Sequence, residues 1–93
     1  MNKTILITGA TSGIGKATAA FLASQGARLI LCGRRQERLD ALKEELPTQV
    51  HTLTFDVRDR AAVFEAIESL PDAFKPIDVL INNAGNAHGL DDV

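Results

Sequence analysis

Four short apolar runs, spread evenly along the chain, constrain the fold more than any other feature of the sequence. They are residues 4–8 (TILIT), 29–32 (LILC), 50–55 (VHTLTF) and 77–81 (IDVLI). The centres of successive runs lie roughly 25 residues apart, which leaves room for a strand and a crossover helix but is too long for a hairpin. We therefore expect parallel strands. The third run alternates apolar and polar residues more than the others, so we expect it near an edge of the sheet.

Three segments between these runs have the signals of helices. We expect helices over residues 14–25, 35–46 and 59–70, with Gly26 and Pro47 ending the first two and Asp59 capping the third. Strands and helices therefore alternate, and right-handed crossovers turn such a chain into a parallel, doubly wound α/β sheet of the Rossmann type. We expect four strands in the order 3-2-1-4 and three helices, forming one domain over residues 1–93.

The first helix is expected to bury an apolar stripe. Ile14, Ala17, Phe21 and Leu22 recur at helical spacing within residues 14–25. Side chains at this spacing lie on one face of an α-helix, so we expect this face to pack on the sheet.

Composition and charge exclude several classes of function. Ten basic residues are balanced by twelve acidic ones, and the net charge is −2. This balance gives no general attraction to nucleic acid or to an anionic membrane. No apolar run approaches the ~20 residues of a membrane span, and a single cysteine, Cys32, allows no internal disulfide. We expect a cytoplasmic protein.

The residues that follow each predicted strand are the candidate functional residues. In a parallel sheet the carboxyl ends of all strands lie at one edge, and open α/β sheets bind their ligands in the crevice outside that edge. A glycine-rich loop follows the first strand, Gly33-Arg34-Arg35 the second, Asp56-Val57 the third and residues 82–85 (NNAG) the fourth. With the order 3-2-1-4, the glycine-rich loop and the NNAG segment face each other.

The glycine-rich loop is suited to bind a pyrophosphate. It comprises Gly9, Ala10, Thr11, Ser12, Gly13, Ile14 and Gly15. Such a loop brings backbone N–H groups and the positive end of the following helix to one point, and Thr11 and Ser12 can add hydroxyl donors. The glycines read GxxxGxG, which matches neither GxGxxG nor the P-loop. The alternative is a tight connection with no ligand.

Two arginines after the second strand favour NADP over NAD. NAD-binding sheets of this type usually carry an acidic residue at this point for the ribose 2′-hydroxyl, whereas a 2′-phosphate requires cations. No carboxylate precedes Glu37, and Arg34 and Arg35 offer two guanidinium groups to a phosphate. Alternatively, both arginines are solvated residues at the start of a charged helix.

The third and fourth strands end in candidate adenosine contacts. Asp56 can accept a hydrogen bond from the adenine amino group while Val57 packs on the ring, although Asp56 could instead cap a helix. Asn83, with its neighbours Ala84 and Gly85, could line the site or form only a turn, because Asn and Gly both tolerate positive φ.

Taken together, these motifs resemble those of the short-chain dehydrogenases/reductases. Residues 8–15 (TGATSGIG) are similar to the family's TGxxxGxG cofactor motif, Asp56 to its adenine-site aspartate, and residues 82–85 to its NNAG motif. The resemblance extends from the first strand to the fourth. Residues 33–39 (GRRQERL) further resemble NADP-dependent members that act on 3-hydroxy acids.

The resemblance implies a role for each motif and a hydride-transfer reaction. By position, residues 9–14 would wrap the pyrophosphate, Arg34 and Arg35 would hold the 2′-phosphate, Asp56 and Val57 would frame the adenine, and Asn83, Ala84 and Gly85 would line the adenosine side. Family members transfer hydride between the nicotinamide of NADP(H) and a small carbonyl or alcohol substrate. We expect a homo-oligomer for the full-length protein.

The family's catalytic residues have no counterpart in this sequence. Family members use a serine, a tyrosine and a lysine that follow the NNAG motif, and this chain contains no tyrosine. We therefore assign no catalytic and no metal-binding residue, and expect the N-terminal, NADP-binding portion of an oxidoreductase. The alternatives are a stand-alone nucleotide-binding module and a structural remnant. Residues 77–81 resemble an interior strand, so as the last of four strands they should form an exposed apolar edge.

Overall fold

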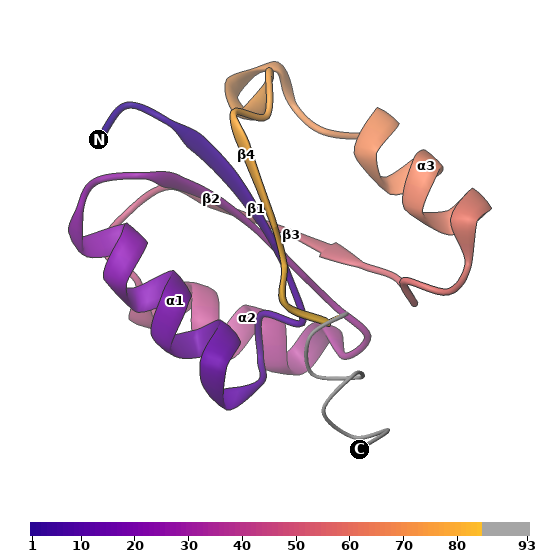
Figure 1. Cartoon of the computed structure of the whole chain (residues 1–93), viewed down its shortest axis with the longest axis horizontal. Coiled ribbons are helices and arrows are strands. Elements are labelled where there is room, and N and C mark those ends of the chain that lie inside the picture. Colours follow the sequence, from indigo (N-terminus) through magenta and orange to yellow (C-terminus); the bar gives the residue numbers. More distant parts are fainter. Residues whose placement is uncertain (85–93) are drawn as a thin grey trace.

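The computed structural model describes residues 1–84, which form a four-stranded sheet with helices on both faces (Figure 1). The elements are β1 (Thr4–Thr8), α1 (Gly13–Ser24), β2 (Arg28–Gly33), α2 (Gln36–Glu45), β3 (Val50–Thr54), α3 (Arg60–Glu68), the 3₁₀ turn η1 (Asp72–Phe74) and β4 (Val79–Asn82). The predicted site residue Gly85 lies outside the described residues.

The strands are all parallel and lie in the order β3-β2-β1-β4. Leu6 at the centre of β1 is in register with Ile30 of β2 on one side and with Leu80 of β4 on the other. The predicted Rossmann-type sheet and its strand order are therefore confirmed. The position of β3 at an edge, predicted from its alternating pattern, is confirmed as well.

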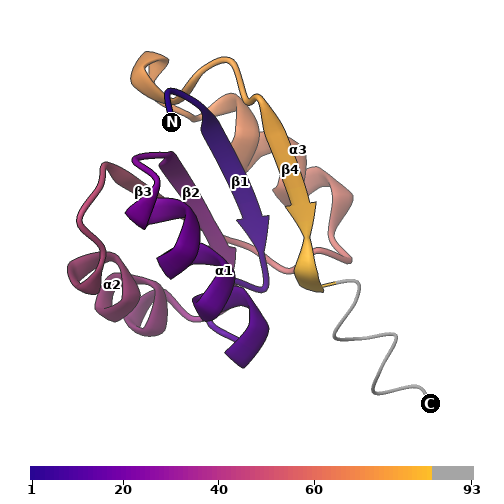
Figure 2. The ribbon, with the colours of Figure 1, turned by 60° about the vertical axis from the view of Figure 1, so that its left-hand side comes forward.

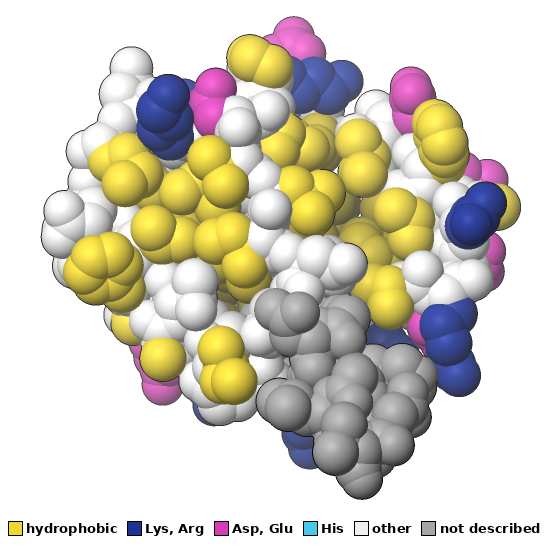
Figure 3. Space-filling view, viewed as in Figure 1, with side chains coloured by type: hydrophobic (Ala, Val, Ile, Leu, Met, Phe, Trp, Pro, Cys, Tyr) yellow, Lys and Arg dark blue, Asp and Glu magenta, His cyan; other side chains and the backbone are white. Residues whose placement is uncertain are grey.

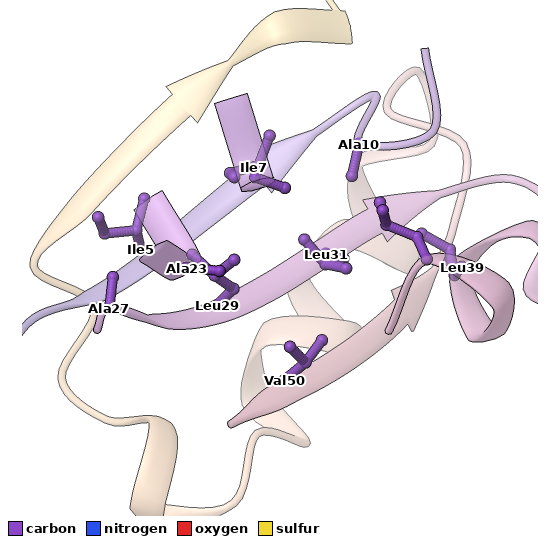
Figure 4. Close-up of a cluster of buried hydrophobic side chains, with 11 residues drawn as sticks. Ile5, Ile7, Ala10, Ala23, Ala27, Leu29, Leu31, Leu39 and Val50 are labelled. Atoms are coloured by element: carbon purple, nitrogen blue, oxygen red, sulfur yellow. The ribbon is translucent and has the colours of Figure 1, made fainter. Parts of the chain in front are cut away.

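The helices form a layer on each face of the sheet. Figure 2 shows α1 and α2 on one face and α3 on the other. Because side chains alternate along a strand, Ile5 and Ile7 pack under the first layer, whereas Leu6 points to the second. Figure 4 shows the cluster under α1 and α2, where strand residues such as Leu29 and Leu31 meet small residues of the helix side.

The buried face of α1 differs from the predicted stripe. Ile14 and Phe21 are 61% and 63% exposed, and the buried residues of α1 are Gly15, Ala19 and Ala23. The sheet beneath α1 already carries large aliphatic side chains. The helix packs on them through its smallest residues and through Leu22, which is partly buried against them as predicted, whereas Ile14 and Phe21 are exposed.

The ends of the elements are set by specific hydrogen bonds. Asp59 caps α3 as predicted, since its Oδ1 accepts from the N–H of Ala62 at 3.1 Å. β4 begins two residues later than predicted. Before it, the Asp78 N–H donates to the Thr4 carbonyl, and the Asp78 carboxylate accepts from the Thr4 N–H, both at 2.8 Å.

The last strand, β4, is an exposed apolar edge, as expected from its sequence. Val79 is 40% and Leu80 59% exposed, compared with 1% for Leu6 on the adjacent strand. Figure 3 shows hydrophobic side chains on this face on both sides of β4. A pocket of about 180 Å³, partly lined by Leu80 and Val63, lies between β4 and the part of α3 that packs on the sheet. Within residues 1–84, no helix combines the length and the apolar character needed to cross a membrane.

The two leucines paired across β1 and β4 should respond differently to truncation. Leu6→Ala removes a fully buried side chain and should lower the free energy of unfolding by about 2–5 kcal/mol. Leu80→Ala changes a side chain that is mostly in solvent, so its cost should stay below about 1 kcal/mol. Urea unfolding of both variants measures the difference. Equal costs would mean that Leu80 is covered in solution and would contradict the prediction.

Candidate cofactor site

The predicted site residues that lie within residues 1–84 come together at one edge of the sheet. Figure 2 shows the arrowheads of β1 and β4 at the same edge, followed by the loops that carry the motifs. The glycine-rich loop after β1 touches the residues after β4, as expected for neighbouring strands: a Cβ at Gly9 would lie 3.0 Å from Ala84 and 3.1 Å from the Asn83 side chain.

The first glycine of the loop is required by both conformation and space. Gly9 has a φ of 59°, in the left-handed region that favours glycine. Its carbonyl accepts a hydrogen bond from the Ser12 N–H at 3.2 Å, which closes the turn between β1 and α1. Another residue at this position would strain the turn and press on the backbone of Ala84.

The hydroxyl of Ser12, predicted as a donor to phosphate, is hydrogen-bonded within the protein in this structure. Its hydroxyl donates to the Gly9 carbonyl at 2.9 Å and accepts from the Gly15 N–H at 3.1 Å, which caps α1. A hydroxyl has one proton to donate, so none is left for a ligand. Thr11 has no hydrogen-bond partner within residues 1–84 and remains the available hydroxyl donor.

The start of α1 presents free donors to solvent. Ser12 takes up the N–H groups of Gly15 and Lys16, whereas those of Gly13 and Ile14 have no partner in the described part of the chain. No acidic residue lies in the first turn of α1, and the space where a Cβ of Gly13 would lie is empty. The positive end of the helix dipole is therefore accessible, which is the requirement for an anion site.

Asn83 joins the residues after β4 to the glycine-rich loop. Its side chain is 3% exposed, and Nδ2 donates to the Gly9 carbonyl at 2.9 Å and to the Ser12 hydroxyl at 2.8 Å. The Ala84 N–H donates to Thr8 Oγ1 at 3.1 Å. The two segments that the strand order was expected to bring face to face are thus bonded to each other.

The two predicted phosphate-binding arginines follow β2 and are exposed. Arg35 occupies the N-cap position of α2, and its side chain makes no capping hydrogen bond. Gln36 fixes this helix end, because its Nε2 donates to Thr52 Oγ1 at 3.1 Å and its Oε1 accepts from the hydroxyl of Thr54. Sequence analysis missed Gln36, since its partners on β3 lie 16 and 18 residues away.

Asp56 follows β3 and is held by a residue that sequence analysis missed, Arg58. Their side chains form an ion pair with an Nη2–Oδ2 distance of 2.8 Å. Hydrogen bonds from Arg58 hold the pKa of the Asp56 carboxyl well below its usual range, and the charge of Arg34 acts in the same direction. The sequence signal that could have revealed this pair is the presence of opposite charges at Asp56 and Arg58, two residues apart. Val57, between them, is 44% exposed.

The two later glycines of the loop should differ sharply in their tolerance of alanine. A Cβ at Gly15 would lie 2.2 Å from the Gly9 carbonyl oxygen and 2.9 Å from Ala10 Cα, both backbone atoms. We expect Gly15→Ala to lower the free energy of unfolding by more than about 2 kcal/mol, whereas Gly13→Ala, which meets nothing within 4 Å, should leave it nearly unchanged. Similar thermal stabilities for the two variants would contradict this contact.

The bond between Asn83 and Ser12 should appear as a coupling free energy. Asn83→Ala should cost about 1–3 kcal/mol, because it leaves buried groups of the loop unsatisfied. In a double-mutant cycle with Ser12→Ala we expect a coupling of about 0.5–2 kcal/mol by urea unfolding. Thr18→Ala is the control, because its hydroxyl bonds only to Ile14 within α1. If the cycle of Asn83 with Thr18 gave the same coupling, the direct bond would not explain it.

Comparison with known proteins gives close relatives that extend well beyond this sequence. The chain is 52% identical over 89 residues to serine 3-dehydrogenase of Rhizobium radiobacter, covering 96% of this chain and 36% of that protein. It is 51% identical over 87 residues to an NADP-dependent 3-hydroxy acid dehydrogenase of Salmonella typhi, covering 94% and 35%. The chain thus spans about a third of the length of these relatives.

A solved structure and a family model agree with these relatives on the fold and the family of this chain. A solved structure of serine dehydrogenase, in a closed form complexed with NADP⁺, superimposes with a TM-score of 0.77 at 45% identity, over 82% of this chain and 31% of that one. The family model for short chain dehydrogenase matches residues 3–92. The chain therefore belongs to the short-chain dehydrogenase family.

Proposed function

We propose that this chain is the NADP-binding portion of an oxidoreductase that transfers hydride between NADP(H) and the carbonyl or alcohol carbon of a small 3-hydroxy acid. One observation carries this proposal: the unpartnered N–H groups at the start of α1 and the two arginines after β2 lie at the same edge of the sheet. A dinucleotide with a 2′-phosphate has two anionic groups of this kind, at its pyrophosphate and at its ribose.

The pyrophosphate would bind at the glycine-rich loop. The N–H groups of Gly13 and Ile14 and the hydroxyl of Thr11 are the donors that have no partner within residues 1–84. Gly9 and Gly15 let the loop lie against the strand ends, and Ala10 is fully buried beneath it. Ser12 would contribute indirectly by holding the loop in this conformation.

The 2′-phosphate would bind to Arg34 and Arg35. Both side chains are exposed, and no carboxylate lies between the end of β2 and Glu37. Guanidinium groups bind phosphate through paired, charge-assisted hydrogen bonds. Names of two relatives support this assignment, since one is called NADP-dependent and a solved structure of another contains NADP⁺.

The adenosine would lie between the turn after β3 and the residues after β4. The Asp56 carboxylate would accept from the adenine amino group, and the exposed side chain of Val57 would contact the ring. Asn83 and Ala84 lie against Gly9 of the glycine-rich loop, and Gly85 follows them in the sequence.

The reaction itself would require residues outside this sequence. The nicotinamide would supply or accept the hydride, and residues 1–93 would provide one dinucleotide-binding half whose role is to hold the cofactor. The names of two relatives, serine 3-dehydrogenase and 3-hydroxy acid dehydrogenase, support a small hydroxy acid as the substrate.

We further propose that the full-length protein is a cytoplasmic homo-oligomer. The cytoplasmic location fits the state of Cys32: burial raises the pKa of its thiol to about 12, so it is a stable free thiol.

Titration with two cofactors tests the proposed role of the arginines. The protein should bind NADPH saturably, and the double variant Arg34→Ala/Arg35→Ala should bind it about 10–100-fold more weakly, because charge-assisted hydrogen bonds to phosphate are lost. Its affinity for NADH, which has no 2′-phosphate, should change little. Fluorescence titration of the reduced nicotinamide measures both affinities.

A matched control separates the phosphate contact from general charge. Arg38→Ala/Arg60→Ala removes the same charge from two other exposed arginines of the described region and should leave both affinities unchanged. Equal losses for NADPH and NADH in the Arg34/Arg35 variant, or no loss for either, would contradict a role in holding the 2′-phosphate. Absence of saturable NADPH binding to the unmodified protein would contradict the proposed function.

A further inference from the structure

The Asp56–Arg58 pair has a geometry that fixes the carboxylate in two ways. Asp56 Oδ1 accepts from the backbone N–H of Arg58 at 2.9 Å, which ties the side chain to its own turn. The guanidinium then approaches edge-on: Nε lies 3.1 Å from Oδ1, and Nη2 lies 2.8 Å from Oδ2. The backbone bond holds only Oδ1, so the carboxylate can still turn over a range of χ2, which is a soft torsion. The guanidinium fork removes that freedom.

This pairing leaves few acceptor positions open on Asp56. A carboxylate has about four lone-pair positions, two on each oxygen. Oδ1 accepts from the Arg58 N–H and from Nε, whereas Oδ2 accepts one short bond from Nη2 and a longer contact of 3.3 Å from Nε. The single Nε–H proton is shared between the two oxygens, so its longer contact does not fill a second position on Oδ2. One lone pair of Oδ2 remains for a further donor, and its direction is set by the plane of the Arg58 fork.

Stability alone is a weak reason for this pair. The Arg58 side chain is 76% exposed and that of Asp56 34%, and ion pairs between exposed side chains contribute between nothing and about 1 kcal/mol. It is also the one ion pair between side chains in the described region. The pair lies at the strand-end edge that carries the proposed adenosine contacts.

We propose that Arg58 is a positioning residue that selects the base of the dinucleotide by orienting the remaining acceptor of Asp56 toward an exocyclic amino group. The proposal rests on the proposed function. Adenine carries an amino group at position 6, which donates to that acceptor. Hypoxanthine carries a carbonyl oxygen there, and this oxygen would face the carboxylate without a proton between them. Arg58 thus acts on the base through Asp56.

A competing role for Arg58 is a direct contact with the cofactor phosphates. Its unused N–H groups are in solvent, and a guanidinium attracts phosphate wherever it can reach one. A phosphate contact would strengthen the binding of every dinucleotide by the same factor, because the phosphates do not depend on the base. The ratio of affinities for two bases therefore distinguishes the two roles.

The experiment compares NADPH with its hypoxanthine analogue, reduced nicotinamide hypoxanthine dinucleotide phosphate. The unmodified protein should bind NADPH about tenfold more tightly, as expected for one hydrogen bond to a charged acceptor. Arg58→Ala should reduce this preference about threefold, mainly by weakening NADPH, and Arg58→Lys should fall between, since an ammonium cannot form the planar fork. Asp56→Ala should abolish the preference.

A double variant tests whether Arg58 acts through Asp56. In the Asp56→Ala background, Arg58→Ala should cause no further change in the preference, because the group that it orients is absent. Arg60→Ala, which removes the same charge two residues away, is the control and should leave the preference at the level of the unmodified protein. Circular dichroism establishes that each variant is folded.

Three outcomes would overturn the proposal. An unchanged preference in Arg58→Ala would mean that Asp56 needs no orientation. Equal weakening of both dinucleotides would assign Arg58 to a phosphate contact, and a preference that survives in Asp56→Ala but is lost in the double variant would mean that Arg58 reads the base itself. In each of these cases NADPH still binds and the proposed function stands. If the unmodified protein bound neither dinucleotide, both proposals would fail together.

Discussion

The close approach of α1 to the end of β1 is the constraint on which the rest of the site depends. Gly15 lies so near the Gly9 carbonyl that a Cβ would come within 2.2 Å of its oxygen, and the turn between them needs the positive φ of Gly9. The same approach explains the small buried residues of α1 and brings its first N–H groups to the edge of the sheet. One packing requirement therefore produces both the buried helix face and the unpartnered N–H groups at the start of α1.

The glycine-rich loop keeps its conformation through bonds to a distant part of the chain. Asn83 donates to Gly9 and Ser12, and Ala84 donates to Thr8, so residues more than 70 positions apart hold one another. Because Asn83 and Ser12 satisfy each other, the loop needs no ligand to reach this shape. Preorganisation of this kind lowers the entropic cost of binding.

The sequence was informative where the signal is local or periodic. The spacing of the apolar runs predicts the parallel sheet, the alternation of residues 50–55 predicts an edge strand, and Asp59 is recognisable as a cap. The predicted buried face of α1 was wrong for Ile14 and Phe21, because hydrophobicity favours large side chains, whereas close packing on a filled sheet requires Gly15 and its small neighbours. Leu22 of the predicted stripe does pack on the buried cluster. The bonds of Gln36 to β3 depend on tertiary geometry, which no local pattern encodes, whereas the fork of Arg58 is local, since Arg58 follows Asp56 by two residues.

The two ends of the site are built from different kinds of residues, and this difference has consequences for how cofactor preference can change. At the glycine-rich loop, the side chain that holds the loop, Asn83, is buried and hydrogen-bonded to the Gly9 carbonyl. Substitutions there would therefore alter the stability of the protein together with any binding at the loop. At the ends of β2 and β3, Arg34, Arg35 and Arg58 are exposed and contribute little to packing. If the proposed roles hold, preference for the 2′-phosphate or for the base would change by substitution at these arginines, while the glycine-rich loop and the sheet remain intact.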